Sequence, residues 1–129
     1  MKRGYCYLVG DILHRGHIIF IKSCKALCDK LICGVLTDEA VMEKKRKPII
    51  GFDERFFVMQ SIKYIDLVVA QNTYSPTNNC NAFTPDILFE SSSHEELGYN
   101  DGRQMIILPY YVEQSSTKIK EKVINEKSD

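Results

Sequence analysis

The chain has 129 residues, of which 44% are hydrophobic and 26% charged, and its formal net charge at pH 7 is zero. A chain of this size and composition folds as one globular domain with its own core. No apolar run is long enough to cross a bilayer, and residues 1–17 lack the features of a secretory signal. We therefore expect one domain over residues 1–129, with a polar tail from about residue 121, in the cytoplasm.

The charged residues are divided unevenly along the chain. Residues 1–63 contain 12 Lys or Arg against 7 Asp or Glu, whereas residues 64–129 contain 5 against 10. The basic half contains no positive stripe with interleaved aromatic residues, so it suits a small anion better than a nucleic acid, and we expect neither a nucleic acid nor a membrane as partner. The cysteines include no Cys-x-x-Cys pair and predict reduced, mostly buried thiols rather than a zinc site. They are Cys6, Cys24, Cys28, Cys33 and Cys80.

The first half of the chain alternates apolar runs with amphipathic segments. Residues 5–9 form a short apolar run that ends at Gly10, which predicts a buried strand, and residues 16–28 repeat apolar side chains at helical spacing. Residues 30–36 predict a second buried strand, followed by a turn at residues 37–39. Residues 53–65 begin with acidic residues and continue with an apolar stripe, which predicts a helix.

The second half continues the same alternation. Three apolar runs predict strands at residues 66–70, 86–90 and 105–109, and residues 71–85 between the first two predict a loop or one short helical turn. Residues 115–127 predict a final helix that Ser or Thr caps. Nearly continuous apolar strands separated by helices indicate an α/β fold, with a five-stranded parallel sheet that helices cover on both faces.

Two histidines stand where the first strand passes into the first helix. His14 and His17 are three residues apart, with Gly16 between them. Parallel sheets bind ligands at the carboxyl ends of their strands, and a helix N-terminus with its free amides favours a phosphate there. Both imidazoles can reach one phosphate chain from the same helical face, and Gly16 leaves room for a ligand beside the backbone.

Two further segments suit an anion. The basic run at residues 44–47 follows the second strand, on the side of the sheet where the histidines lie, so it can fold over a polyphosphate; Arg55 lies in the helix start that follows. Residues 113–120 (Glu-Gln-Ser-Ser-Thr-Lys-Ile-Lys) offer hydroxyl groups and free amides at another helix N-terminus.

These segments together resemble a known family. Asp-Ile-Leu-His-Arg-Gly-His, Thr-Asp-Glu, Lys-Lys-Arg-Lys-Pro-Ile, Ile-Lys-Tyr-Ile-Asp-Leu-Val-Val and Ser-Ser-Thr-Lys-Ile-Lys occur in this order, as in the cytidylyltransferase family of small α/β nucleotidyltransferases. The likeness covers about residues 5–124. It implies a Rossmann-like fold, usually a homodimer, that transfers CMP from CTP to a small phosphorylated alcohol or a phosphonate and releases pyrophosphate.

The resemblance also implies site residues. His14, His17 and Lys44 match the family's catalytic residues. Nucleotide and phosphate contacts are expected from Val9, Gly10, Asp11, Gly16, Ser115, Ser116 and Thr117. Substrate contacts are expected from Asp38, Arg46, Arg55 and Tyr110. No carboxylate cluster predicts a metal site of the protein itself, so Mg²⁺ is expected to arrive on the triphosphate.

The sequence departs from the family at three segments. Residues 8–11 stand where the family has Gly-Thr-Phe-Asp or similar, residues 91–94 where it has Gly-Asp-Asp-Trp, and residues 110–114 where it has Arg-Thr-x-Gly-Ile. The sequence predicts a modest preference for CTP over ATP. An ATP-using adenylyltransferase of the same superfamily is an alternative. Others are a non-catalytic nucleotide-binding module, which the intact histidines and Lys44 disfavour, and a tRNA-synthetase-like core, for whose tRNA-binding parts the chain is too short.

Overall fold

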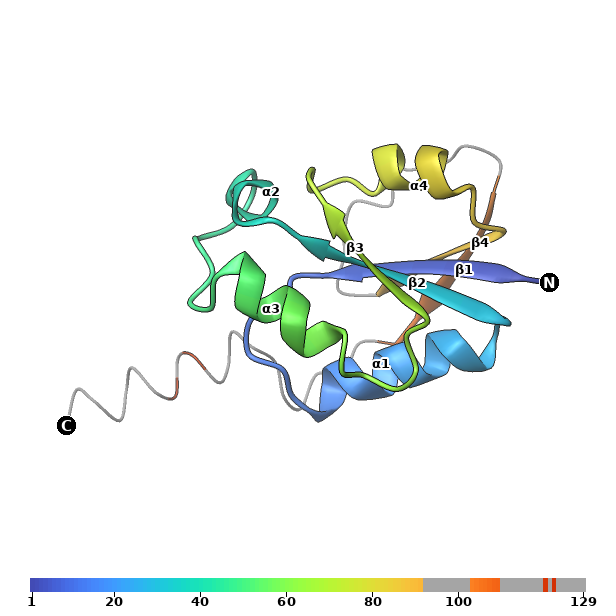
Figure 1. Ribbon diagram of the computed structural model, residues 1–129, viewed down its shortest axis with the longest axis horizontal. Coiled ribbons are helices and arrows are strands. Elements are labelled where there is room, and N and C mark those ends of the chain that lie inside the picture. Colours follow the sequence, from blue (N-terminus) through green and yellow to red (C-terminus); the bar gives the residue numbers. More distant parts are fainter. Residues whose placement is uncertain (92–102, 110–119, 121, 123–129) are drawn as a thin grey trace.

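The computed structural model describes residues 1–91, 103–109, 120 and 122. Strands and helices alternate along the chain as the apolar pattern predicts (Figure 1). The elements are β1 (Arg3–Leu8), α1 (Arg15–Ala26), β2 (Lys30–Leu36), α2 (Asp38–Met42), α3 (Phe52–Met59), β3 (Leu67–Gln71), α4 (Thr77–Phe83), β4 (Ile87–Ser91) and β5 (Gln104–Leu108).

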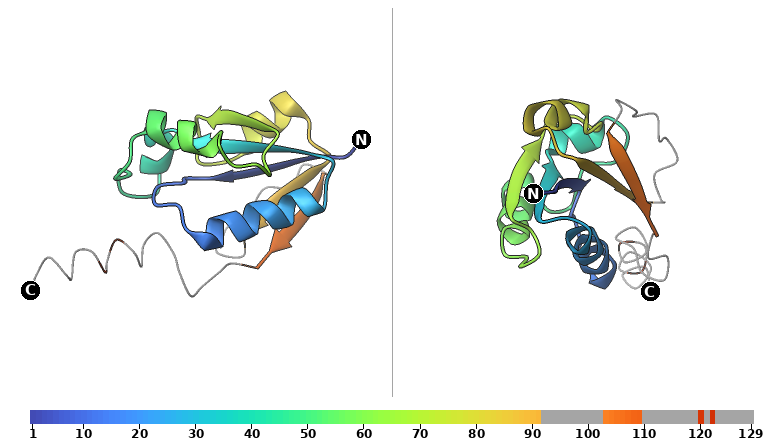
Figure 2. Two further views of the ribbon diagram at one scale, coloured as in Figure 1. Left: turned by 60° about the horizontal axis from the view of Figure 1, so that its bottom comes forward. Right: turned by 90° about the vertical axis from the view of Figure 1, so that its right-hand side faces the viewer.

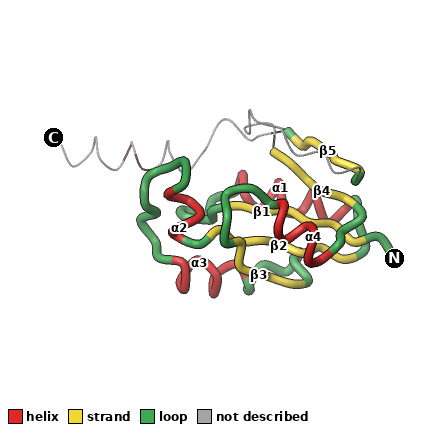
Figure 3. The backbone as a smooth tube through the Cα atoms, turned by 90° about the horizontal axis from the view of Figure 1, so that it is seen from above, coloured by secondary structure: helices red, strands yellow, loops and turns green. Residues whose placement is uncertain are grey.

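All five strands are parallel and form one sheet in the order β3-β2-β1-β4-β5. β2 is buried over its last six residues, as expected of a strand that is covered on both faces. From β1 to β3 the chain adds each strand on one side, and it then crosses back to place β4 on the other side of β1 (Figure 3). The strand order therefore reverses between β1 and β4.

Helices cover both faces of the sheet (Figure 2). α1 and α3 pack on one face, where Ile21 and Met59 join a core with Cys6 and Cys33. α2 and α4 pack on the other face. The predicted Rossmann-like fold is confirmed, and α1 and α2 both begin at the carboxyl ends of the strands.

Three local predictions differ from the structure. The expected turn at residues 37–39 is the start of α2, because the Thr37 hydroxyl accepts a hydrogen bond from the Ala40 amide and so caps a helix. α3 ends at Met59 rather than residue 65. α4 forms a helix of seven residues where a loop or one short helical turn is expected, and Thr84, which follows it, lies in the left-handed region. The predicted helix 115–127 lies outside the described residues, apart from Lys120 and Lys122, which are helical.

The other predictions concern the cysteines, membrane-spanning helices, the extent of the domain, the oligomeric state and the location. All five cysteines are free and four are buried, which confirms the prediction of reduced, mostly buried thiols. In the parts of the chain that the structure describes, no helix is both long and apolar enough to pass through a bilayer. The single-domain extent, the homodimer and the cytoplasmic location stay predictions.

Candidate active site

The two histidines form the N-terminal cap of α1. His14 is the N-cap residue in extended conformation, and its Nδ1 atom accepts a hydrogen bond from the Gly16 amide at 3.0 Å. The Nδ1 atom of His17 accepts from the His14 amide at 3.2 Å, and the two ring centroids lie 4.1 Å apart. The motif is therefore a capping box, with histidines in the places that Ser and Glu usually occupy.

This cap determines which nitrogen of each ring carries a proton. An Nδ1 atom that accepts a hydrogen bond is unprotonated, so a neutral imidazole bears its proton on Nε2. Burial lowers the pKa of both histidines, and burial together with the neighbouring His14 lowers the pKa of His17 to about 4. Both rings are therefore neutral at pH 7 and present Nε2–H as their donor, at a helix end that already favours anions.

The loop between β1 and α1 turns at Gly10, whose φ is +69°. A side chain is strained in this left-handed conformation, and a Cβ atom would lie 3.5 Å from the Met59 sulfur. Gly10 thus turns the chain from the end of β1 towards Asp11 and the histidines. The preceding carbonyl, of Val9, points to the Arg55 guanidinium at 2.6 Å.

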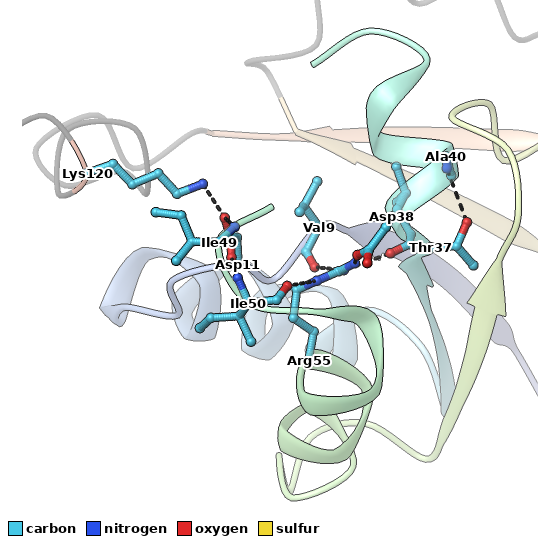
Figure 4. A network of polar contacts seen from close by, with 10 residues as sticks. Val9, Asp11, Thr37, Asp38, Ala40, Ile49, Ile50, Arg55 and Lys120 are labelled. Carbon is cyan, nitrogen blue, oxygen red and sulfur yellow. Dashed lines mark hydrogen bonds and ion pairs between the residues drawn. The ribbon is translucent and has the colours of Figure 1, made fainter. Parts of the chain in front are cut away.

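Arg55 joins four segments beneath the site (Figure 4). Its fully buried guanidinium donates to the carbonyls of Val9, Leu36 and Ile50, and it pairs with the Asp38 carboxylate at 2.7 Å. The sequence predicts both charged residues as substrate contacts. In the structure the guanidinium faces protein groups and holds the ends of β1 and β2 together, and substrate contacts by Arg55 and Asp38 stay predictions.

Asp11, like Arg55, is buried and bonded to protein groups from other segments. It is 2% exposed and accepts hydrogen bonds from the amides of Ile49 and Ile50 at 2.9 and 2.8 Å, and it pairs with Lys120. Burial raises the pKa of Asp11, but the hydrogen bonds from Lys120 and from the two amides outweigh burial and lower it overall. The carboxylate thus ties the loop after β1 to the segment before α3 (Figure 4).

Lys120 is a site residue that the sequence does not single out. It lies in segment 113–120, where the sequence predicts phosphate contacts from the hydroxyl residues Ser115, Ser116 and Thr117. Its contact with Asp11 spans 109 residues of sequence. The spacing of residues in the sequence does not reveal a contact between residues so far apart. The positive charge of Lys120 is the sequence feature that points to it.

The basic segment after α2 contacts the loop after β3. The Lys44 and Lys45 ammonium groups lie 5.3 and 6.0 Å from the centre of the Tyr74 ring, within the range of cation–π attraction. The Glu43 carboxylate accepts from the Tyr74 amide at 2.9 Å. Arg46 is exposed on the same segment. Tyr74 belongs to no motif, and sequence reasoning did not identify it.

Several predicted residues lie outside the described part of the chain: Tyr110, Ser115, Ser116 and Thr117. Their expected contacts, like those of the histidines and Lys44, stay predictions. Gly16 is buried in the first turn of α1.

The described carboxylates give no ligand set for a metal ion. Asp11 accepts hydrogen bonds from two amides and forms an ion pair with Lys120, and Asp38 forms an ion pair with Arg55. Among the residues that the structure describes, no three His, Cys, Asp or Glu side chains group to hold an ion. Mg²⁺ carried by the triphosphate stays a prediction.

A parallel sheet with a His-x-Gly-His cap on its first helix is the arrangement of the nucleotidyltransferase superfamily that carries this motif, and the chain is a member of that superfamily. The chain belongs to the cytidylyltransferase-like family, which it matches over residues 10–122.

Curated relatives include proteins named bifunctional protein HldE. The chain is 30% identical over 118 residues to the one from Helicobacter acinonychis, a match that covers 88% of this chain and 26% of that protein. It is 34% identical over 96 residues to the one from Caulobacter sp. (strain K31), covering 73% and 20%. The chain thus spans about a quarter of the length of these relatives, or less.

Solved structures share the fold. The crystal structure of the lipopolysaccharide core biosynthesis protein from Thermoplasma volcanium matches with a TM-score of 0.73 and 22% identity, over 85% of this chain and 96% of that chain. The pantothenate synthetase of Thermus thermophilus matches with a TM-score of 0.60 and 12% identity, over 94% and 64%.

Proposed function

We propose that this domain transfers a nucleoside monophosphate from a nucleoside triphosphate to a small phosphate-bearing acceptor and releases pyrophosphate. The observation that carries the proposal is the histidine cap of α1, which engages the Nδ1 atom of each neutral ring and so leaves Nε2–H as its donor, at a helix N-terminus that follows the carboxyl end of β1. Such donors suit the phosphates of a nucleotide.

The nucleotide that we propose is ATP, ahead of the CTP that the sequence predicts. The similarity to HldE proteins favours ATP. Two of the segments in which the chain departs from the cytidylyltransferase pattern, residues 91–94 and 110–114, support the same choice. CTP remains the second candidate because the matching family is cytidylyltransferase-like.

The proposed reaction is a direct displacement. An anionic oxygen of the acceptor's phosphate forms a bond to the α-phosphorus of the triphosphate, and the bond from the α-phosphorus to the bridging oxygen breaks, so that pyrophosphate leaves. The attacking oxygen is already ionised at neutral pH, so no strong general base is needed. The protein contributes by holding two anions in line and by stabilising the charge on the transferred and leaving groups.

The neutral state of the histidines suits this role. Each ring presents its Nε2–H without first having to take up or release a proton. We propose that the positive charge comes instead from Lys44 and Arg46, on the segment after α2, which would hold the acceptor's phosphate. Asp11 and Arg55 would position the loops between these groups.

The test measures pyrophosphate release with ATP and CTP against a panel of phosphate and phosphonate acceptors, alongside calorimetric titration of each nucleotide in Mg²⁺. We expect turnover with at least one acceptor and tighter binding of ATP. If CTP binds more tightly than ATP and is turned over faster, CTP takes the place of ATP as the proposed nucleotide. Nucleotide binding without pyrophosphate release for any pair would favour a non-catalytic module.

A further inference from the structure

Arg15 is an exposed residue at the first position of α1, between the two histidines of the cap. Its guanidinium forms no hydrogen bond or ion pair with the residues that the structure describes. Arg3, Arg55 and Arg103, by contrast, each donate to protein carbonyls. The donors of Arg15 are therefore open to a ligand.

A cation at this position opposes the dipole of the helix. The N-terminal end of an α-helix carries a partial positive charge, so acidic side chains stabilise it and cations destabilise it. α2 and α3 each have two acids in the first turn, whereas α1 has none there. Asp11, the acid that precedes the cap in the sequence, is buried and already accepts from two amides and from Lys120. Neither the first turn nor Asp11 therefore compensates the charge of Arg15, and an anion bound at this helix end would.

The place of Arg15 in the helix gives it access to such an anion. The Cα–Cβ bonds of an α-helix are tilted towards its N-terminal end, so a long side chain at the first position extends towards that end. The Nε2–H donors of His14 and His17 belong to the same turn. Arg15 can thus reach an anion that these donors bind.

Asp11 joins the loop before Arg15 to the loop after Arg46. It accepts hydrogen bonds from the amides of Ile49 and Ile50, which follow the basic run at residues 44–47 (Figure 4). Two arginines thus lie on segments that meet at one buried carboxylate. A pair of substrates bound across this junction would have a cation on each side.

The proposed reaction needs a cation for each of two anions. Lys44 and Arg46 are assigned above to the acceptor's phosphate. The second anion is the leaving group, because negative charge builds on the β-phosphate as the bond between the α-phosphorus and the bridging oxygen breaks. The neutral histidines can donate to this charge but cannot balance it. A guanidinium group can, and its planar pair of N–H donors matches two oxygens of a phosphate.

We propose that Arg15 is a catalytic residue that binds the β- and γ-phosphates of the nucleoside triphosphate and stabilises the pyrophosphate leaving group. The part of the ligand that it recognises is thus the polyphosphate, and neither the base nor the sugar. This inference rests on the proposed function and deepens it, because it assigns the leaving group to one side chain.

The experiment compares Arg15→Gln and Arg15→Lys with the wild-type chain. Lys22→Gln is the matched control, because it removes an exposed cation from the same helix, about two turns further along. Each chain is titrated calorimetrically in Mg²⁺ with ATP, CTP, AMP, CMP and inorganic pyrophosphate. Steady-state pyrophosphate release is measured with the acceptor that the wild type uses best, and urea unfolding is measured without ligand.

We expect Arg15→Gln to bind triphosphates and pyrophosphate about tenfold more weakly than the wild type and to keep its affinity for monophosphates, which lack the groups that Arg15 binds. Its kcat should fall by on the order of 10². Arg15→Lys should recover part of both losses, since it keeps the charge without the planar donor pair. Without ligand, Arg15→Gln should unfold at the same or a higher urea concentration than the wild type, because a cation has left the helix N-terminus.

Three results would overturn the inference. They are wild-type affinity of Arg15→Gln for triphosphates and pyrophosphate, an equal loss of affinity for monophosphates, and an equal effect of Lys22→Gln, which would show that only the overall charge matters. Failure of the proposed function has a different signature. Pyrophosphate would then bind in a manner that depends on Arg15, but the wild type would release none from any nucleotide.

Discussion

The His14 amide donates a hydrogen bond to the Nδ1 atom of His17, one turn further along α1. The same side chains that begin the helix thus also orient the donors that we assign to the phosphates. A substitution at either position affects helix capping and phosphate binding together, unless the new side chain can perform one of the two roles alone.

Asparagine separates these roles at position 14. Asn is a good N-cap residue but places no donor where the imidazole Nε2–H lies. We expect His14→Asn to keep its free energy of unfolding within about 0.5 kcal/mol of the wild type, whereas His14→Ala loses about 1 kcal/mol. Both variants should lose on the order of 10²–10³ in kcat. Urea unfolding and steady-state pyrophosphate release measure the two effects, and wild-type turnover by folded His14→Asn would remove His14 from the mechanism.

The low pKa of His17 predicts how stability changes with pH. The pKa is about 4 in the folded chain against 6.5 for an unperturbed histidine, so between these values the unfolded state takes up a proton that the folded state does not. The contribution of His17 is complete above pH 6.5 and is lost as the pH falls towards 4, by on the order of 2 kcal/mol. Urea midpoints between pH 7 and 4 test this in the wild type and in His17→Gln, which keeps the cap hydrogen bond but cannot titrate. Equal pH dependence in both chains would contradict the assignment.

We expect Arg55 to contribute mainly to the free energy of unfolding. Its removal leaves three backbone carbonyls and the Asp38 carboxylate without their donor in the interior, so we expect Arg55→Met to lose about 3–5 kcal/mol of unfolding free energy. Lys22→Met, which removes an exposed cation on α1, is the control and should change little. If Arg55→Met unfolds like the wild type but raises the KM for the acceptor, Arg55 is a substrate contact as the sequence predicts.

Gly34 makes room for a buried hydrogen bond between Tyr5 and Gln71. A Cβ atom at position 34 would lie 2.0 Å from the Tyr5 phenol oxygen and 2.8 Å from Gln71 Oε1. We therefore expect Gly34→Ala to lose about 1–3 kcal/mol of unfolding free energy, and Tyr5→Phe in the same chain to recover part of it. Gly51→Ala is the matched control, because nothing lies within 4 Å of the added atom. Additive losses in the double variant would show that the phenol is not the obstacle.

The sequence predicts the sheet well because its signal is local. The run at residues 30–36 is β2 itself, and the other four strands are found within about two residues of the predicted ends. Each is a continuous apolar run between turn residues. A parallel strand that is buried on both faces needs such a run. The segment Thr37-Asp38-Glu39 is compatible with a turn and with a helix start, since a capped helix start and a turn use the same residue types.

The site is predictable only where its chemistry lies in short motifs. The histidine pair is such a motif, and the structure places it at the expected helix start. Arg55 was found, but its partners are mostly backbone carbonyls, which residue types do not reveal. The contacts of Asp11 with Lys120 and of Tyr7 with Glu90 join segments that only the completed sheet brings together.

The crossing from β3 to β4 also has a consequence for how the chain folds. β1 pairs with β2 at Arg3 and Lys30, which are 27 residues apart, and β2 pairs with β3 at Ile32 and Leu67, which are 35 residues apart. β4 reaches β1 from further along the sequence, since the hydrogen-bonded Arg3 and Asp86 are 83 residues apart. Because loop closure precedes the gain from such contacts, we expect β4 to dock after the folding transition state. Ile32→Val in β2 should then give a higher φ-value than Leu88→Ala in β4, and the reverse order would refute this sequence of events. β1, which leads into the histidine cap of α1, would thus be in place before β4 brings Glu90 to Tyr7.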